Sequence, residues 1–169
     1  NECKKYFKVF NTKNDIVEFI HAENSLEAKM KYVKHNKLLS TFNVRAIEAN
    51  DFIAERNYVM VCFMVNSGLR SSEVLDLTVE KINYNQQEIR VIGKRNKERI
   101  VQLNTLTTKM LKNYIEKFNL SGYVFPTEKG TKLSKPAMNK LFEKITKHTG
   151  IKINPHMTRH TYGQMEYDR

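Results

Sequence analysis

The chain carries a histidine and an arginine three residues apart, in the stretch His156-Met157-Thr158-Arg159. Residues with this spacing share one face of a helix, so the imidazole and the guanidinium could hold the same anion. A guanidinium is a planar fork of donors that suits phosphate oxygens, and a histidine can donate or carry a proton near neutral pH. The pair alone also fits an ordinary basic surface helix, so its meaning depends on which other cations join it.

A second candidate is Arg70, which follows the turn-forming residue Gly68 and stands three residues before Glu73. At the start of a helix, backbone N–H groups and the helix dipole add positive potential to that of an arginine. Glu73 could orient the guanidinium or cap the helix. The ordinary alternative is an exposed arginine in a weak local ion pair, and the local sequence alone favours it.

A third candidate is the basic segment from Gly93 to Arg99, which contains Lys94, Arg95, Lys97 and Arg99. It lies between two β-prone segments and therefore predicts a hairpin tip. A charged tip is commonly just solvated, but it can also enter a DNA groove, where a lysine can protonate a leaving oxygen. Lys94 follows Gly93 at the end of the strand and is the cation best placed for a defined role.

We expect no metal ion and no other cofactor. Cys3 and Cys62 stand far apart, which argues against a disulfide framework and against a cysteine-based zinc site. Cys62 lies in an apolar run and is predicted to be a small buried hydrophobe. The histidines outside the H-x-x-R stretch show no spacing that would converge with nearby carboxylates on a metal; they are His21, His35, His148 and His160.

The elements that must hold these residues mix helices with a small sheet, which predicts an α+β fold. A helical pattern runs over Val44–Val65 and stops at Gly68, and Ser71 or Ser72 can cap the short helix that follows. Three β-prone segments within residues 82–103 predict an antiparallel meander. Helical patterns return at Thr107–Phe118, at Pro136–His148 (with Ser134 as cap and Gly150 as stop) and after Pro155.

The N-terminal residues carry weaker patterns. Lys5–Phe10 alternates as a strand would, or as the end of a linker. Thr12–Asp15 resembles a capping box and predicts a helix over Ile16–Ile20. The polar and basic stretch 21–43 predicts further helical pieces.

Size and charge limit the class of protein. The 169 residues, 40% of them hydrophobic, suffice for one ordinary domain with a short appendage. A net charge of +11 suggests a polyanionic partner, because phosphate neutralisation and counterion release drive such binding, although a lysine-rich surface alone gives the same balance. No apolar run has the length of a membrane span and no signal-peptide pattern opens the chain. We therefore expect an intracellular protein with no membrane partner.

Three motifs follow one another along the chain: Ser67-Gly68-Leu69-Arg70-x-x-Glu73, Gly93-Lys94-x-Asn96-Lys97-Glu98-Arg99 and Pro155-His156-x-x-Arg159-His160, with the lead-in Arg56-Asn57-Tyr58. Each motif is a weak signal by itself, whereas the ordered set around a hairpin is specific. Together they resemble the tyrosine recombinase family of phage integrases and Xer proteins. The resemblance implies a mainly α-helical catalytic domain with a small three-stranded antiparallel sheet over residues 44–169. Residues 1–43 would be a partial core-binding region or a linker.

The resemblance also implies roles for individual residues. Arg70 and Arg159 would clamp the scissile phosphate. Lys94 would be the general acid for the 5′-hydroxyl leaving group, and His156 would assist proton transfer and phosphate binding. The further assignments are Glu73 and His160 as structural supports, and Arg95, Lys97 and Arg99 as DNA contacts.

The family places a histidine or tryptophan phosphate ligand and a tyrosine nucleophile some tens of residues after the H-x-x-R motif, but only a short stretch follows Arg159. Tyr162 stands where the family carries a packing aromatic, which leaves Tyr167 as the tentative nucleophile. Two explanations are open. The chain is a catalytic-domain fragment without its nucleophile, or residues are missing between Gly163 and Gln164, in which case Tyr167 becomes the best candidate.

The leading hypothesis is a site-specific DNA recombinase that cuts and rejoins strands through a covalent 3′-phosphotyrosyl intermediate, in integration, excision or resolution. It would act as a homo-tetramer on a double-stranded DNA recombination site, through a Holliday junction. Accessory DNA-bending or directionality proteins would assist it in the nucleoid-associated cytoplasm. Two alternatives stay open: a catalytically incomplete DNA-binding or regulatory relative, and a type IB topoisomerase-like enzyme that relaxes DNA without exchanging partners.

Overall fold

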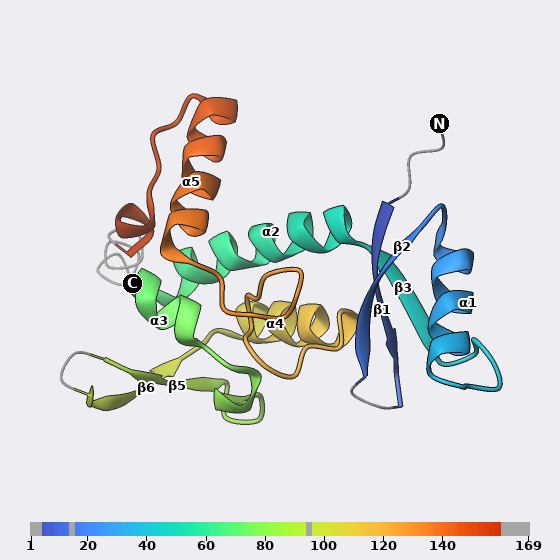
Figure 1. Ribbon diagram of the computed structural model, residues 1–169. Helices are drawn as coiled ribbons and strands as arrows, with labels where there is room; N and C mark the ends of the chain where they lie inside the picture. Colours follow the sequence, from blue (N-terminus) through green and yellow to red (C-terminus); the bar gives the residue numbers. More distant parts are fainter. Residues whose placement is uncertain (1–4, 14–15, 94–95, 160–169) are drawn as a thin grey trace. The chain divides into compact units, whose positions relative to one another are not determined.

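The computed structural model describes residues 5–13, 16–93 and 96–159 (Figure 1). The chain separates into two compact units, Asn1–Glu55 and Arg56–Arg169, and the division falls within helix α2 (Ala49–Ser67). The sequence places the boundary earlier, between residues 43 and 44, and the roles expected of the two parts stay predictions. No helix in the described parts of the chain is long and apolar enough to cross a membrane.

The N-terminal unit is a three-stranded antiparallel sheet with one helix packed on it. Strand β1 (Lys5–Asn11) lies between β2 (Val17–Ala22) and β3 (Val44–Glu48). Helix α1 (Ser25–His35) covers one face of this sheet (Figure 1). The core between sheet and helix is formed by Phe7, Val9, Ala22, Ala28, Tyr32 and Val44.

Two segments that the sequence predicts as helical are strands. Val17–Ala22 pairs with one edge of β1, where Ile20 lies opposite Phe7, and Val44–Glu48 pairs with the other edge. The helix predictions were wrong there because a short run of β-branched and aromatic residues suits either element, and only the partner strand decides. The strand alternative for Lys5–Phe10 is confirmed by β1.

In the second unit, α2 stops at the predicted place, where Gly68 takes a left-handed conformation with a φ of 63°. Helix α3 (Ser71–Asp76) follows, but its N-cap residue is Arg70 and not a serine. That prediction was wrong because the helix start is held from its third residue: the Glu73 carboxylate accepts a hydrogen bond from the Arg70 backbone N–H at 2.8 Å. Cys62, expected to be buried, is only partly buried on α2.

The predicted meander is confirmed as the second sheet. Strands β4 (Ile82–Asn83), β5 (Glu88–Ile92) and β6 (Glu98–Gln102) follow one another in antiparallel order. Ile89 and Val91 on β5 are buried. One face of this sheet therefore contributes to the core of the second unit, and β5 and β6 form the hairpin whose tip holds the basic segment.

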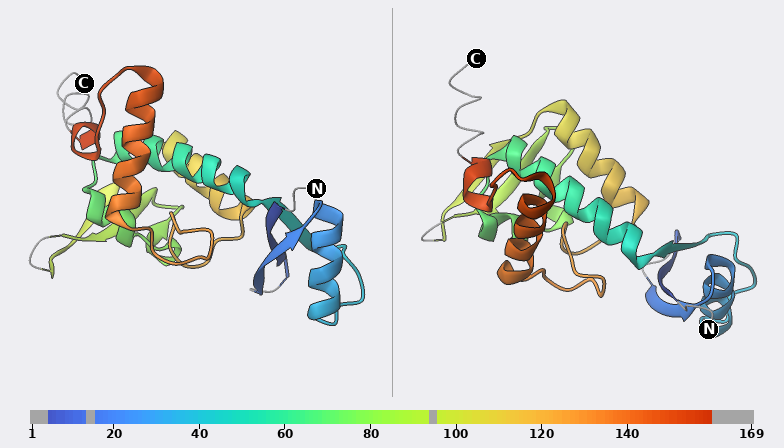
Figure 2. Two further views of the ribbon diagram at one scale, coloured as in Figure 1. Left: turned by 45° about the horizontal axis from the view of Figure 1, so that its top comes forward. Right: turned by 90° about the horizontal axis from the view of Figure 1, so that it is seen from above.

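The later helices also agree with the sequence. They are α4 (Thr105–Lys117) and α5 (Lys135–Thr149), and α5 begins at the Ser134 cap and ends at Gly150, whose φ is 71°. Residues 155–159 form the described part of a last helix, which lies beside α5 in both views of Figure 2. The predicted α+β fold class, mainly helical with a small three-stranded antiparallel sheet, is confirmed. The sheet of the N-terminal unit was not predicted.

Candidate active site

Arg70, His156 and Arg159 line one cleft of about 430 Å³. The cleft lies between the N-terminal ends of α3 and α5 and the helix at 155–159. These residues come from segments far apart in the sequence, so the fold of the second unit is what brings them together. The anion site suggested by their residue types is thus supported by a shared concave surface.

The wall that carries His156 and Arg159 is a short capped helix. The Asn154 side-chain oxygen accepts hydrogen bonds from the backbone N–H of His156 and of the next residue, both at 3.0 Å, and Pro155 opens the helix as predicted. Thr158 is buried, and its hydroxyl donates to the Pro155 carbonyl at 2.8 Å. With Thr158 turned inward, His156 and the half-buried Arg159 line the cleft.

The loop that leads into this short helix is tied back to α5. The Thr146 hydroxyl donates to the Ile153 carbonyl at 3.2 Å, and the Ile153 N–H donates to the same hydroxyl oxygen at 3.1 Å. This reciprocal pair acts just before Asn154. It therefore sets the point at which the chain turns from α5 toward the cleft.

The opposite wall holds Arg70 through a carboxylate. Glu73 accepts one hydrogen bond from the Arg70 backbone N–H at 2.8 Å and another from the Arg70 Nη1 at 3.2 Å. The sequence offers two interpretations of Glu73, orienting the arginine or capping the helix, and the structure contains both contacts. The Arg70 side chain stays 39% exposed, so it is anchored at Glu73 while it still reaches the cleft.

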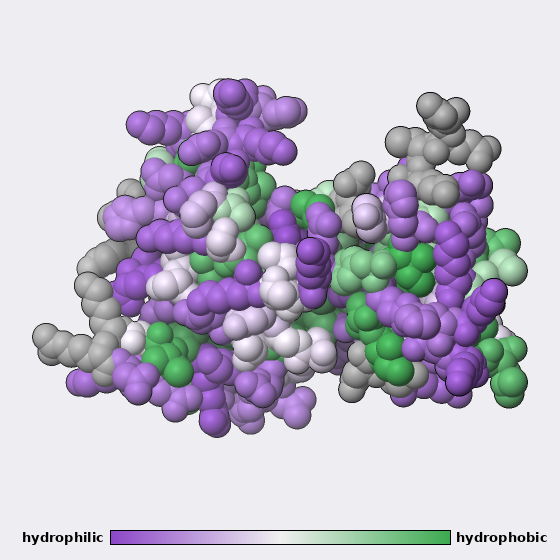
Figure 3. Space-filling view, in the orientation of Figure 1, coloured by the Kyte–Doolittle hydropathy of each residue, from purple (hydrophilic) through white to green (hydrophobic). Residues whose placement is uncertain are grey.

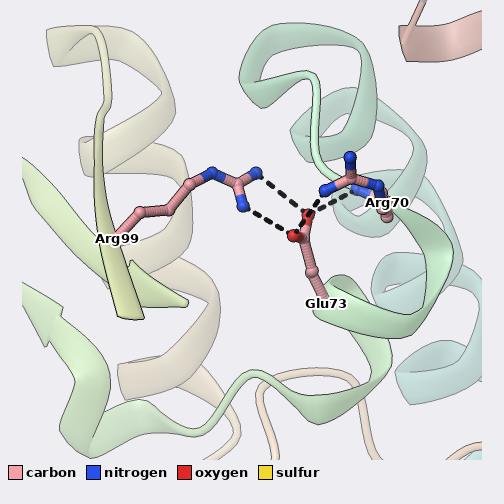
Figure 4. Close-up of polar contacts among 3 residues, drawn as sticks. All are labelled: Arg70, Glu73 and Arg99. Carbon is pink, nitrogen blue, oxygen red and sulfur yellow. Dashed lines mark hydrogen bonds and ion pairs between the residues drawn. The ribbon is translucent and has the colours of Figure 1, made fainter. Parts of the chain in front are cut away.

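A second arginine reaches the same carboxylate (Figure 4). Arg99 on β6 donates from Nη1 to Glu73 Oε1 at 2.6 Å and from Nη2 to Oε2 at 3.1 Å. The Glu73 side chain is 3% exposed, so this is a buried anion between two cations. Arg99 is predicted from the sequence to contact DNA, and its guanidinium lies at Glu73; the DNA contact stays a prediction.

Further residues at the cleft were not predicted from the sequence. Lys135 is the first residue of α5, where the positive end of the helix dipole disfavours a cation. A bound anion would offset that cost. The sequence carries no signal that would have singled out Lys135. The other unpredicted lining residues are Ser71, Ser72, Asn139 and Asn154.

The remaining predicted site residues fall into two groups. Lys94, Arg95, His160 and Tyr167 lie outside the described residues. Lys97 is exposed, and its carbonyl accepts a hydrogen bond from the Gly93 N–H at 2.8 Å. This bond closes the hairpin next to the tip, so the residue that precedes Lys94 has a defined place.

The cleft has the chemistry of a site for one phosphate group. Two arginines line it from two walls, and a histidine and a lysine are also among its lining residues. Fixed donors of this kind stabilise the negative charge that builds on phosphoryl oxygens during nucleophilic attack. Hydrophilic side chains also cover much of the face of the molecule seen in Figure 3, as expected for a chain with a net charge of +11.

Several known proteins with similar sequences are tyrosine recombinases, the family that the motifs of the sequence resemble. The model of the phage integrase family matches residues 31–165. The chain is 30% identical over 129 residues to the tyrosine recombinase XerC of Shewanella sp. (strain ANA-3), which covers 73% of this chain and 43% of the relative. It is 32% identical over 117 residues to the tyrosine recombinase XerD of Pasteurella multocida (strain Pm70), with 63% and 39% covered.

Among solved structures, the XerH site-specific recombinase bound to a palindromic difH substrate, in a post-cleavage complex, is similar with a TM-score of 0.60. The identity is 23%, and the match covers 86% of this chain and 41% of that one. At this identity the likeness concerns the fold. The chain spans less than half the length of each of these three proteins.

Proposed function

The chain belongs to the phage integrase family, and on that premise we propose that it is part of a site-specific DNA recombinase. This enzyme is a tyrosine-type DNA strand transferase that cuts and rejoins DNA in integration, excision or resolution. The observation that carries the proposal is the single cleft lined by Arg70, His156 and Arg159. A concave site with two guanidiniums and an imidazole suits a phosphodiester better than it suits an uncharged substrate.

The chemistry assigned to these residues is a transesterification. A tyrosine oxygen, for which Tyr167 is the candidate, attacks the phosphorus and loses its proton with the help of His156. As the new O–P bond forms, the P–O5′ bond breaks, and the leaving 5′-oxygen takes a proton from the Lys94 ammonium group. Arg70 and Arg159 stabilise the charge on the non-bridging oxygens. The second transesterification reverses these steps with the 5′-hydroxyl of another strand.

The partners proposed are a double-stranded DNA recombination site and three further copies of the protein, which together form a tetramer around a Holliday junction. Accessory DNA-bending or directionality proteins and a cytoplasmic, nucleoid-associated location belong to the same proposal. The net charge of +11 supports binding to DNA, because cationic side chains that neutralise phosphates release condensed counterions.

The test is covalent trapping. The full-length gene product is incubated with a pool of nicked duplexes that cover the DNA flanking its gene, so that a cleaved strand diffuses away and the protein–DNA link persists. We expect an adduct that survives denaturation and is joined through a tyrosine. Absence of any adduct would contradict the enzyme and favour a DNA-binding relative. An adduct with strand relaxation but no exchange between two duplexes would favour a topoisomerase.

A further inference from the structure

We infer that Arg99 is a positioning residue, which ties the hairpin that carries Lys94 to the helix that carries Arg70. The Glu73 carboxylate is the link between them. This inference rests on the proposed function, and it deepens the account of that site by giving Arg99 a role other than contact with DNA. We call Arg70, Glu73 and Arg99 the arginine–carboxylate bridge.

Each oxygen of the Glu73 carboxylate accepts two hydrogen bonds in the bridge. Glu73 Oε1 accepts from Arg99 Nη1 at 2.6 Å and from Arg70 Nη1 at 3.2 Å. Glu73 Oε2 accepts from Arg99 Nη2 at 3.1 Å and from the Arg70 backbone N–H at 2.8 Å. Figure 4 shows the two guanidiniums on opposite sides of the carboxylate. Arg70 thus has two contacts of its own with Glu73, and the contacts of Arg99 with the same carboxylate are separate from them.

The Glu73 carboxylate needs the two arginines because it is buried. The Glu73 side chain is 3% exposed, and a buried carboxylate is tolerated when charged donors compensate for its lost hydration. Arg99 supplies two parallel hydrogen bonds from one planar fork, which a lysine cannot reproduce. Arg99 is thus held by the protein in a set orientation, whereas a residue that contacts DNA alone would have no reason to face a buried acid.

The bridge lies beside Gly93, the residue that precedes the predicted acid in the sequence. Residues Ile92 and Glu98 are the last paired positions of the β5–β6 hairpin, and the Gly93 N–H donates to the Lys97 carbonyl beyond them. A Cβ atom at Gly93 would lie 3.7 Å from Arg99 Nη1 and 3.7 Å from Glu73 Oε1. The residue directly before Lys94 is therefore packed beside the bridge. Loss of Arg99 would free the hairpin from α3 at this point.

The experiment compares two leaving groups in the full-length gene product. One substrate is the normal DNA duplex. The other has sulfur in place of the bridging 5′-oxygen, and its thiolate leaves without a proton from a general acid. We expect Arg99→Ala to cleave the normal substrate about 100-fold more slowly and the sulfur substrate within about threefold of the wild type, because the acid is displaced and the clamp remains. DNA affinity should stay close to that of the wild type.

The matched control is Arg90→Ala, which removes an exposed guanidinium from the neighbouring strand β5 and should leave both rates unchanged. Arg99→Lys keeps the positive charge, and circular dichroism should show that this variant is folded. Its cleavage rate should fall less than that of Arg99→Ala, and only on the normal substrate. The positioning role is overturned if a folded Arg99 variant loses cleavage rate equally on both substrates. It is also overturned if weaker DNA binding accounts for the slower cleavage. Unchanged rates overturn it as well. Failure of the wild type to cleave either substrate contradicts the proposed function itself, and the inference falls with it.

Discussion

The two walls of the cleft hold their arginines in different ways. Arg70 is anchored to a buried carboxylate, Glu73, which Arg99 also binds from another element. Arg159 lies on a short helix that is held by neutral hydrogen bonds, of which the cap from Asn154 is one. The first wall concentrates its stability in one buried charge, while the second distributes it over several weak contacts. A single substitution should therefore cost more stability on the first wall than on the second.

The largest effect is expected on the rate of strand cleavage, for a substitution at Arg159. Arg159→Lys should slow strand cleavage about 1,000-fold, because a lysine keeps the charge but lacks the fork that holds two phosphoryl oxygens. Single-turnover formation of the covalent adduct measures the rate, and filter binding measures DNA affinity, which should stay within about threefold of the wild type. Cleavage at the wild-type rate would show that this wall does not clamp the phosphate.

The next effect is on stability, at the centre of the first wall. Glu73→Gln should lower the free energy of unfolding by about 2–3 kcal/mol, less than for a fully buried pair because both arginines are partly exposed. Urea unfolding of the 169-residue chain measures it. The exposed Glu143 on α5 provides a matched control, and Glu143→Gln should change stability by less than about 0.5 kcal/mol. Equal changes in the two variants would contradict the bridge.

A substitution in the second wall should lower the free energy of unfolding by less than one in the first wall. Asn154→Ala should lower the free energy of unfolding by about 1 kcal/mol through loss of the helix cap, and Asn154→Ser should recover most of it because serine caps equally well. The same urea titration compares both variants with Glu73→Gln. A loss at Asn154 as large as that at Glu73 would mean that the two walls are not built differently.

The smallest effect concerns a residue between the walls, Lys135. Lys135→Ala should weaken DNA binding a few-fold and reduce the slope of log affinity against log salt by about 1, as expected for one lost phosphate contact. Lys109→Ala, on the exposed side of α4, is the control and should leave the slope unchanged. An unchanged slope for Lys135→Ala would place Lys135 outside the phosphate site.

The candidate site was predictable where the signal is local. The caps Ser134 and Gly150 show where α5 begins and ends, whereas Arg70, His156 and Arg159 are recognisable only when their short motifs are taken together in order. Caps and motifs each consist of a few neighbouring residues, so one sequence suffices.

Other features depend on partners far away in the chain and could not be predicted. Val17–Ala22 becomes a strand because β1 is available beside it. Arg99 resembles any other cation of a basic hairpin until the fold brings it to Glu73, 26 residues away in the sequence. Lys135 is one lysine among many, and only its place at the cleft distinguishes it.

The most direct test of the account is a crystal structure of the full-length gene product bound to a nicked target duplex. We predict that guanidinium nitrogens of Arg70 and Arg159 lie about 2.7–3.1 Å from oxygens of one and the same scissile phosphate, with His156 beside it. If the two arginines contact different phosphates, or if the scissile phosphate lies outside the cleft, Arg70 and Arg159 do not form a clamp for the scissile phosphate.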